Sequence, residues 1–189
     1  MVVFALPRLL IPVESTPGET RVAATPDTVK KFVSLGCSVA VECGAGTPSG
    51  YLDEAYAEKG ADLIEKGDTS AWGQADVLLC VQSPSAASLA RLRQGALVVG
   101  LLSPYANEEL TAALKRSGLS AMALELLPRI SRAQSADALS SQANIAGYKS
   151  VLLASAALDR YFPMLMTACL LYTSPSPRDA TLSRMPSSA

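Results

Sequence analysis

The 189-residue sequence contains no histidine. That absence removes the most common general base and the most common metal ligand of proteins. Aromatic residues make up only 5% of the chain, so a core has to be built from Val, Leu, Ile and Ala. The apolar runs fall short of the roughly 18–20 residues that a membrane-spanning helix requires. The formal net charge of −1 gives no reason to expect nucleic acid or an anionic membrane as a partner.

The cysteines are spaced neither as a zinc site nor as a CxxC redox pair; they are Cys37, Cys43, Cys80 and Cys169. We therefore expect no metal site and interpret the four thiols as small buried hydrophobic groups in a reducing compartment. A hydrophobic content of 49% and a charged content of 17% are typical of a globular domain with a real core.

Apolar segments of strand length alternate with segments of helical period along most of the chain. The strands are expected at 8–14, 38–46, 75–84, 96–104 and 119–127, and the helices between them at 25–36, 52–62, 87–95 and 107–118. Thr25 followed by Pro26 predicts a helix start, and Asn107 predicts another. This alternation predicts an α/β fold, a Rossmann-like or flavodoxin-like parallel sheet with helices on both faces.

A long helix rich in Ala, Gly and Ser is expected from about residue 140 to 162, after the sheet. Such small side chains let another backbone approach closely, so we expect this helix to pack against a neighbouring domain or subunit. A helix packed in the ordinary core is the alternative.

Four predicted loops and one polar segment meet at the carboxyl edge of the predicted sheet, where such folds bind ligands. The polar segment, residues 129–148, reads RISRAQSADALSSQANIAGY and follows the last predicted strand. The first loop carries Arg21, whose guanidinium can hold a carboxylate, a phosphate or a facing acid such as Glu14. The CGAG sequence at 43–46 is interpreted as a turn, and the chain contains no GxGxxG phosphate-binding motif.

The segment PGETRVAATP resembles the opening of two related families, the alpha subunits of proton-translocating NAD(P) transhydrogenase and the alanine dehydrogenases. The residues that carry this resemblance are Glu14, Glu19, Arg21, Thr25 and Pro26. In alanine dehydrogenases a lysine binds the keto acid and a histidine does acid–base work, whereas the matching positions here hold Gln82 and Ser103. That departure argues against amino-acid dehydrogenation.

The polar segment resembles the signature loop of the transhydrogenase alpha subunit almost throughout, except that Ala136 stands where a methionine is usual. The resemblance implies that this segment helps to hold the dihydronicotinamide ring of NAD(H). The catalytic residues that it implies are Gln134, Asp137 and Arg129, and the cofactor-binding residues are Arg129, Gln134, Asp137, Ser140 and Tyr148. From the residue types alone, Gln134 can bond a carboxamide as donor and acceptor, and Ser140 can instead cap the long helix.

The same resemblance implies a homodimer of alpha subunits, with NADP(H) on a membrane-embedded beta subunit and a cytoplasmic position, peripheral on the inner membrane. We expect residues 1–139 to form the first α/β subdomain and residues 140–168 to be a helix leading toward an NAD-binding Rossmann subdomain missing from this chain. Residues 169–189, rich in Ser and Pro, resemble translated sequencing-adapter sequence and are expected to be a non-native tail. The alternatives are an alanine-dehydrogenase-like enzyme or a non-catalytic truncated module.

Overall fold

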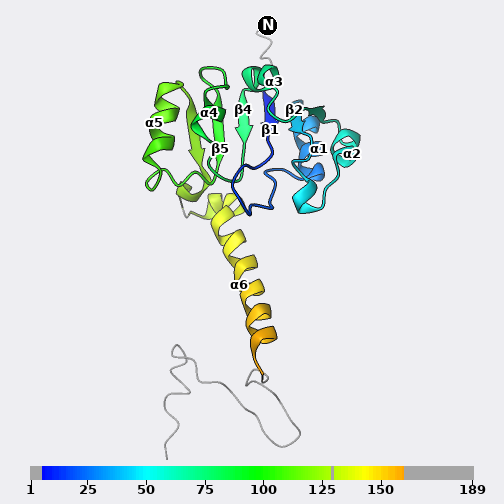
Figure 1. The fold of residues 1–189 in the computed structure, drawn as a ribbon, viewed down its shortest axis with the longest axis vertical. Coiled ribbons are helices and arrows are strands. Elements are labelled where there is room, and N and C mark those ends of the chain that lie inside the picture. The colour runs from blue at the N-terminus through cyan, green and yellow to red at the C-terminus, as the bar shows by residue number, and fades with distance from the viewer. Residues whose placement is uncertain (1–5, 129, 160–189) are drawn as a thin grey trace, which may run out of the picture. The chain divides into compact units, whose positions relative to one another are not determined.

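A six-stranded parallel sheet with helices on its faces is the main feature of the computed structural model, which describes residues 6–128 and 130–159 (Figure 1). Its six strands are β1 Arg8–Ile11, β2 Ser38–Glu42, β3 Asp62–Ile64, β4 Val77–Leu79, β5 Leu97–Gly100 and β6 Ser120–Ala123. Their order in the sheet is β3-β2-β1-β4-β5-β6, and every neighbouring pair is parallel. The chain therefore reverses its direction of travel across the sheet between β1 and β4, which is where doubly wound sheets bind ligands.

Helices cover both faces of the sheet, as predicted. One face packs Leu9, Ile11, Val39 and Val41 beneath α1 Pro26–Ser34 and α2 Asp53–Glu58. The other face packs Leu10, Ala40, Leu78 and Val98 beneath α3 Thr69–Gln74, α4 Ala86–Leu89 and α5 Glu108–Arg116. Because consecutive strand residues point to opposite faces, these runs of apolar residues supply two cores.

The predicted helix starts are confirmed. Thr25 accepts a hydrogen bond from the backbone N–H of Thr28 at 3.3 Å, and Pro26 is the first residue of α1. Asn107 accepts one from the N–H of Leu110 at 2.9 Å. In each case the side chain satisfies a backbone donor that the first turn of a helix leaves without a partner.

Two elements between residues 62 and 74 were missed by the sequence prediction. The strand β3 has only three residues, two of them exposed, so it lacks the apolar run that marks the inner strands. The helix α3 follows Asp68, whose carboxylate accepts hydrogen bonds from the N–H groups of Ser70 and Ala71. The predicted strands were also too long, and β1 ends before Pro12, which has no N–H to donate to a neighbouring strand.

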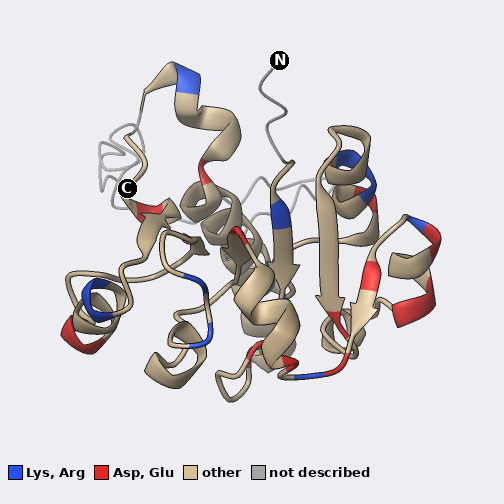
Figure 2. Cartoon of the chain, turned by 90° about the horizontal axis from the view of Figure 1, so that it is seen from above, with Lys and Arg blue, Asp and Glu red and all other residues tan. Residues whose placement is uncertain are grey.

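Charged residues of both signs are scattered over the helices and loops in the described part of the chain (Figure 2). The helix α5 carries both signs, with Glu108 and Glu109 in its first turn and Lys115 and Arg116 in its last. This arrangement complements the helix dipole, so these charges stabilise the helix that bears them.

The chain divides into two compact units, Met1–Leu139 and Ser140–Ala189. The helix α6, Ala138–Ala157, begins two residues before the predicted start, and most of its length belongs to the second unit. Its apolar side chains are largely exposed; Ile145, Val151, Leu152 and Leu153 are 49–60% exposed. The helices of the described residues include none that is long and apolar enough to cross a membrane. The helix ends at Ala157, before the predicted end at 162, so that part of the prediction is wrong. The boundary at 168 and the expected tail 169–189 lie outside the described residues.

Candidate functional site

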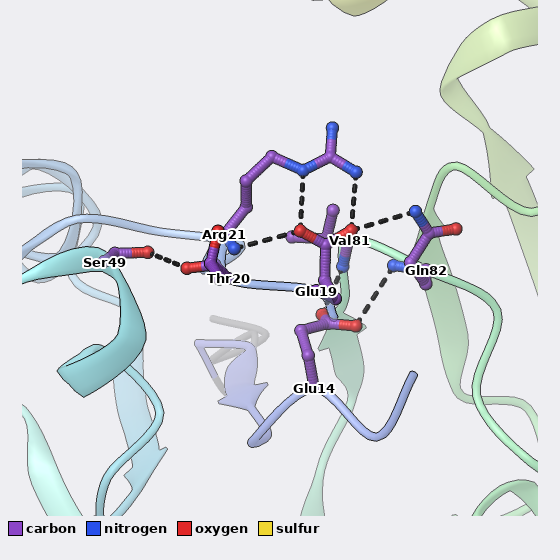
Figure 3. A network of polar contacts seen from close by, with 7 residues as sticks. All are labelled: Glu14, Glu19, Thr20, Arg21, Ser49, Val81 and Gln82. Carbon is purple, nitrogen blue, oxygen red and sulfur yellow. Dashed lines mark hydrogen bonds and ion pairs between the residues drawn. The ribbon is translucent and has the colours of Figure 1, made fainter. Parts of the chain in front are cut away.

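The point where the chain reverses across the sheet is built from the loops that follow β1 and β4 (Figure 3). The first loop runs from the end of β1 to Thr25, and its Glu19 backbone closes a turn by donating to the carbonyl of Thr16 at 3.1 Å. Gly18 in this turn has a φ of +81°, a conformation that glycine adopts without steric cost. The turn directs the Glu19 side chain toward the loop after β4.

Glu19 and Arg21 form a bidentate ion pair within this loop. The Arg21 Nε donates to Glu19 Oε1 at 2.8 Å, and its Nη2 donates to Glu19 Oε2 at 2.6 Å. Gln82, from the loop after β4, donates its side-chain amide to the same Oε2 at 2.9 Å. These hydrogen bonds lower the pKa of Glu19 from 4.5 to about 2, and the largest contribution comes from the hydrogen bonds of the Arg21 side chain. The acid that faces Arg21 is thus Glu19.

Glu14 contacts the backbone of the loop after β4 instead of Arg21. Its carboxylate accepts hydrogen bonds from the backbone N–H groups of Val81 at 2.5 Å and Gln82 at 3.2 Å. Burial raises the pKa of this carboxyl, and the two backbone hydrogen bonds act in the opposite direction. Glu14 therefore ties the end of β1 to the end of β4, and it reaches Arg21 only through longer-range charge attraction.

A third carboxylate, Glu42 at the end of β2, is buried in the same region with 2% of its surface exposed. It accepts hydrogen bonds of 2.8 Å each from the N–H groups of Val13 and Gly67 and from the indole Nε1 of Trp72. The sequence gives no signal for this residue, because its three partners come from three separate segments. Glu14, Glu42 and Gln82 help to line a pocket of about 130 Å³ at this edge, together with Lys66, Trp72, Cys80 and Arg91.

The polar segment lies after β6 and is partly described. Its residues Ser131–Ala136 form a short 3₁₀ helix, and Gln134 and Asp137 line one pocket of about 130 Å³ with Leu127, Pro128, Ile130 and Ala133. The structure thus brings Gln134 and Asp137 to the same small pocket, whose other walls are mainly apolar.

The remaining predicted site residues are Arg129, Ser140 and Tyr148. Arg129 lies outside the described residues. Ser140 and Tyr148 lie on α6 in the second compact unit, where Tyr148 is 70% exposed. Ser140 follows the start of α6 at Ala138, so it is a residue of the first turn rather than the residue that precedes the helix.

A further polar contact links the loops after β5 and β6. Ser103 has a φ of +46°, which is unusual for a residue other than glycine, and its N–H donates to the carboxylate of Glu125. Sequence reasoning singled out Ser103 but missed Glu125, which follows β6 in the short 3₁₀ helix Leu124–Leu126. The pair fastens two neighbouring loops of the carboxyl edge to each other.

The cysteines differ from one another in exposure. Cys80 is buried, and its burial raises the pKa of the thiol to about 12. The prediction of burial is wrong for Cys43, which is exposed in the turn after β2, and Cys37 is partly buried. Among the described residues, no group of three or more acidic or cysteine side chains is arranged to hold a metal ion.

Comparison with known proteins identifies related sequences over most of the chain. The sequence profile of the alanine dehydrogenase/PNT N-terminal domain matches residues 10–146. The chain is 43% identical over 166 residues to an NAD(P) transhydrogenase subunit alpha polypeptide of Rhodospirillum rubrum, in an alignment that covers 85% of the chain and 43% of that protein. It is 37% identical over 118 residues to alanine dehydrogenase of Mycobacterium tuberculosis, in an alignment that covers 62% of the chain and 32% of that enzyme.

Solved structures give the same order of similarity. The transhydrogenase from Sinorhizobium meliloti superposes with a TM-score of 0.78 at 46% identity, over 85% of this chain and 48% of that one. An L-alanine dehydrogenase superposes with a TM-score of 0.72 at 29% identity, over 79% of this chain and 40% of that one. Alanine dehydrogenase is the more distant relative in both comparisons, and the chain spans less than half the length of these relatives.

Proposed function

The chain belongs to the alanine dehydrogenase/PNT N-terminal domain family, and on that premise we propose that it forms the first segment of the NAD(H)-binding alpha subunit of a proton-translocating, Re/Si-specific NAD(P) transhydrogenase. The observation that carries this proposal is the pocket shared by Gln134 and Asp137 directly after the sheet. A polar pair in a mainly apolar pocket at this edge suits a flat ring that carries a carboxamide.

The size of that pocket fits a portion of a dinucleotide. At about 130 Å³ it is well below the roughly 300–1,000 Å³ of a site for a whole drug-sized ligand. The small pocket volume and the lack of a GxGxxG motif in the sequence both support a nucleotide site whose main contacts lie in a further Rossmann subdomain. We place the first subdomain at 1–139 and the connecting helix from residue 140 onward.

NAD(H), when bound, supplies the hydride that is exchanged with NADP(H) on a partner subunit. Such an exchange needs no acid or base from the protein, but it needs the two rings to be close, correctly oriented and shielded from water. In the proposed site, Gln134 bonds the carboxamide as donor and acceptor, and Asp137 orients Gln134 or Arg129. Ser140 and Tyr148 are the remaining proposed contacts.

The proposed assembly is a homodimer of alpha subunits that works with a membrane-embedded, NADP(H)-binding beta subunit. The exposed apolar side chains of α6 support the expectation that another protein surface covers this helix, because large exposed apolar patches mark such contacts. The protein would then lie on the cytoplasmic side of the inner membrane and attach to it through its partners.

An alanine-dehydrogenase-like activity is the alternative function. Gln82 argues against it, because its neutral amide already donates to Glu19 and adds no positive charge for a keto acid. Ser103 cannot exchange protons near neutral pH as a histidine does. The chain alone is expected to turn over neither reaction.

Two experiments test the proposal. Titration calorimetry of the 189-residue chain with NADH should detect no binding at millimolar concentrations, whereas micromolar binding would contradict the proposed division of the nucleotide site.

In the complete alpha subunit, Gln134→Asn should slow hydride transfer by at least about 10-fold while leaving NADH affinity within about 2-fold, because the shorter side chain changes ring placement. An equal loss of rate and affinity would count against the role proposed for Gln134.

A further inference from the structure

The contact between Ser103 and Glu125 combines two features that cost stability. The backbone of Ser103 has a φ of +46°, in the left-handed region that residues other than glycine rarely adopt. The N–H of Ser103 donates to Oε1 of Glu125, whereas the buried Oε2 accepts no hydrogen bond from any residue that the structure describes. A strained backbone and a buried acceptor without a donor both lower stability, and such features concentrate at ligand-binding and active sites.

Ser103 offers its N–H from a place that the sheet holds firmly. The N–H of Leu101, just after β5, donates to the carbonyl of Val81 at 3.0 Å. Ser83 Oγ donates to the carbonyl of Leu102 at 2.8 Å. Because the donor to Glu125 is itself a backbone N–H, these contacts with the neighbouring backbone fix the donor in space.

The sheet itself stops short of the Ser103–Glu125 contact. The pairing of β5 with β6 extends to Gly100 opposite Ala123, and Glu125 follows two residues later. Further along, several backbone N–H groups bond to carbonyls only two or three residues back in the chain; they belong to Leu127, Ile130, Ala133 and Asp137. Such local bonds shape the segment but do not fasten it to the sheet. The contact of Glu125 with Ser103 does fasten it.

The fastened segment builds the pocket in which the ring is proposed to bind. Leu127 and Pro128, shortly after Glu125, line this pocket of about 130 Å³ together with Gln134 and Asp137. Hydride transfer requires two rings at close range and in the correct orientation, so a small displacement of the pocket slows it strongly. Movement of the segment would displace Gln134 and Asp137 together.

We infer that Glu125 is a positioning residue of this pocket: by accepting the hydrogen bond of Ser103, it sets where Gln134 and Asp137 stand relative to the sheet. The inference rests on the proposed function, because that function assigns the ring to this pocket. Glu125 does not contact the ring in this proposal and acts through the backbone that follows it.

NMR spectroscopy of the backbone amides in the 189-residue chain tests the contact without any nucleotide. Glu125→Ala should speed hydrogen exchange of the Ser103 amide by at least about 10-fold, because the acceptor is lost. The heteronuclear NOE values of Gln134 and Asp137 should fall, since the segment gains fast motion, while that of Val98 in β5 stays unchanged. Glu125→Gln keeps an oxygen that can accept the same bond, so its exchange rate should stay within about 3-fold of wild type.

A hybrid alpha subunit tests the consequence for the reaction. It is the Rhodospirillum rubrum polypeptide with residues 10–146 of this chain in place of the matching segment. Glu125→Ala should slow hydride transfer from NADH to an NADP⁺ analogue by about 10-fold or more and leave NADH affinity within about 2-fold, because it misplaces the ring. Glu125→Gln should transfer hydride within about 3-fold of the unmodified hybrid. Glu58→Ala, at an exposed glutamate of α2, is the matched control and should change neither value.

Glu125→Asp takes the place of Glu125→Ala in both experiments if the alanine variant does not fold. Its carboxylate is one methylene shorter, so it should weaken the contact with Ser103 and shift both readouts in the same direction.

Unchanged exchange and NOE values in a folded variant would overturn the inference, as would hydride transfer at the unmodified rate. An equal loss of rate and of NADH affinity would identify a general structural role for Glu125 and would also overturn it. A hybrid that transfers no hydride with Glu125 intact would contradict the proposed function instead. The NMR comparison would then decide by itself whether Glu125 fastens the segment to the sheet.

Discussion

The buried carboxylate of Glu42 should be one of the most important polar groups for the stability of the sheet. It receives three hydrogen bonds of 2.8 Å and joins the segments that follow β1 and β3 to the indole of Trp72 in α3. We predict that Glu42→Ala strongly lowers the free energy of unfolding, because it leaves three buried donors without their acceptor.

The magnitude follows from the number of bonds. A hydrogen bond to a charged group contributes about 1.5 kcal/mol or more, so the loss of three amounts to about 4–5 kcal/mol. That is a large fraction of the roughly 5–15 kcal/mol by which a domain is stable. Glu42→Gln should cost less, about 1–3 kcal/mol, because its amide oxygen can still accept two of the bonds while its NH₂ meets the third donor.

Urea unfolding followed by circular dichroism and by fluorescence measures both values, since Trp72 is the single tryptophan of the chain. Glu58→Ala is the matched control, because Glu58 is an exposed glutamate on α2 and should change stability by less than about 0.5 kcal/mol. A loss below about 1 kcal/mol for Glu42→Ala would refute the reasoning and mean that water replaces the carboxylate without penalty.

The pKa of Glu19, lowered from 4.5 to about 2 chiefly by Arg21, predicts that its contribution to stability is present above pH 4.5 and is lost as the pH falls toward 2. The difference in unfolding free energy between wild type and Glu19→Gln should shrink over that range, and a difference that stays constant would contradict it. Asn107→Ala should cost about 1 kcal/mol in urea unfolding while Asn107→Asp costs almost nothing, because only the first removes the acceptor for the N–H of Leu110; equal losses would argue against capping. Cys43 should react with a thiol reagent at pH 8 in the folded protein, whereas Cys80, buried and with a thiol pKa of about 12, should react only on unfolding. Peptide mass mapping of the modified sites checks this order, and early labelling of Cys80 would contradict it.

The segments of the fold that the sequence predicts are those encoded by neighbouring residues. Thr25 with Pro26 and Asn107 mark helix starts through contacts only three residues away, and both are found in the structure. The inner strands are marked by apolar runs, because both of their faces are covered. The strand β3 at the sheet edge was missed, since its sequence DLI is short and mostly exposed.

The contacts of the candidate site depend on partners that are distant in the sequence. Arg21 could be expected to face an acid, but the choice of Glu19 over Glu14 depends on the turn at Gly18 and on the approach of Gln82. From the sequence alone, Glu42 cannot be told from an ordinary polar residue at the end of a strand, because its three hydrogen-bond donors come from distant segments. A pattern of neighbouring residues contains no information about such long-range contacts.

The central claim is that this chain supplies the first segment of a transhydrogenase alpha subunit rather than of an amino-acid dehydrogenase. The most direct measurement replaces the matching segment of the Rhodospirillum rubrum subunit with residues 10–146 of this chain and assays the assembled complex. We predict hydride transfer from NADH to an NADP⁺ analogue within about 10-fold of the parent rate, an activation difference of about 1.4 kcal/mol or less. We also predict no oxidation of NADH with pyruvate and ammonia. A hybrid that oxidises NADH with pyruvate and ammonia but transfers no hydride to the analogue would contradict the claim.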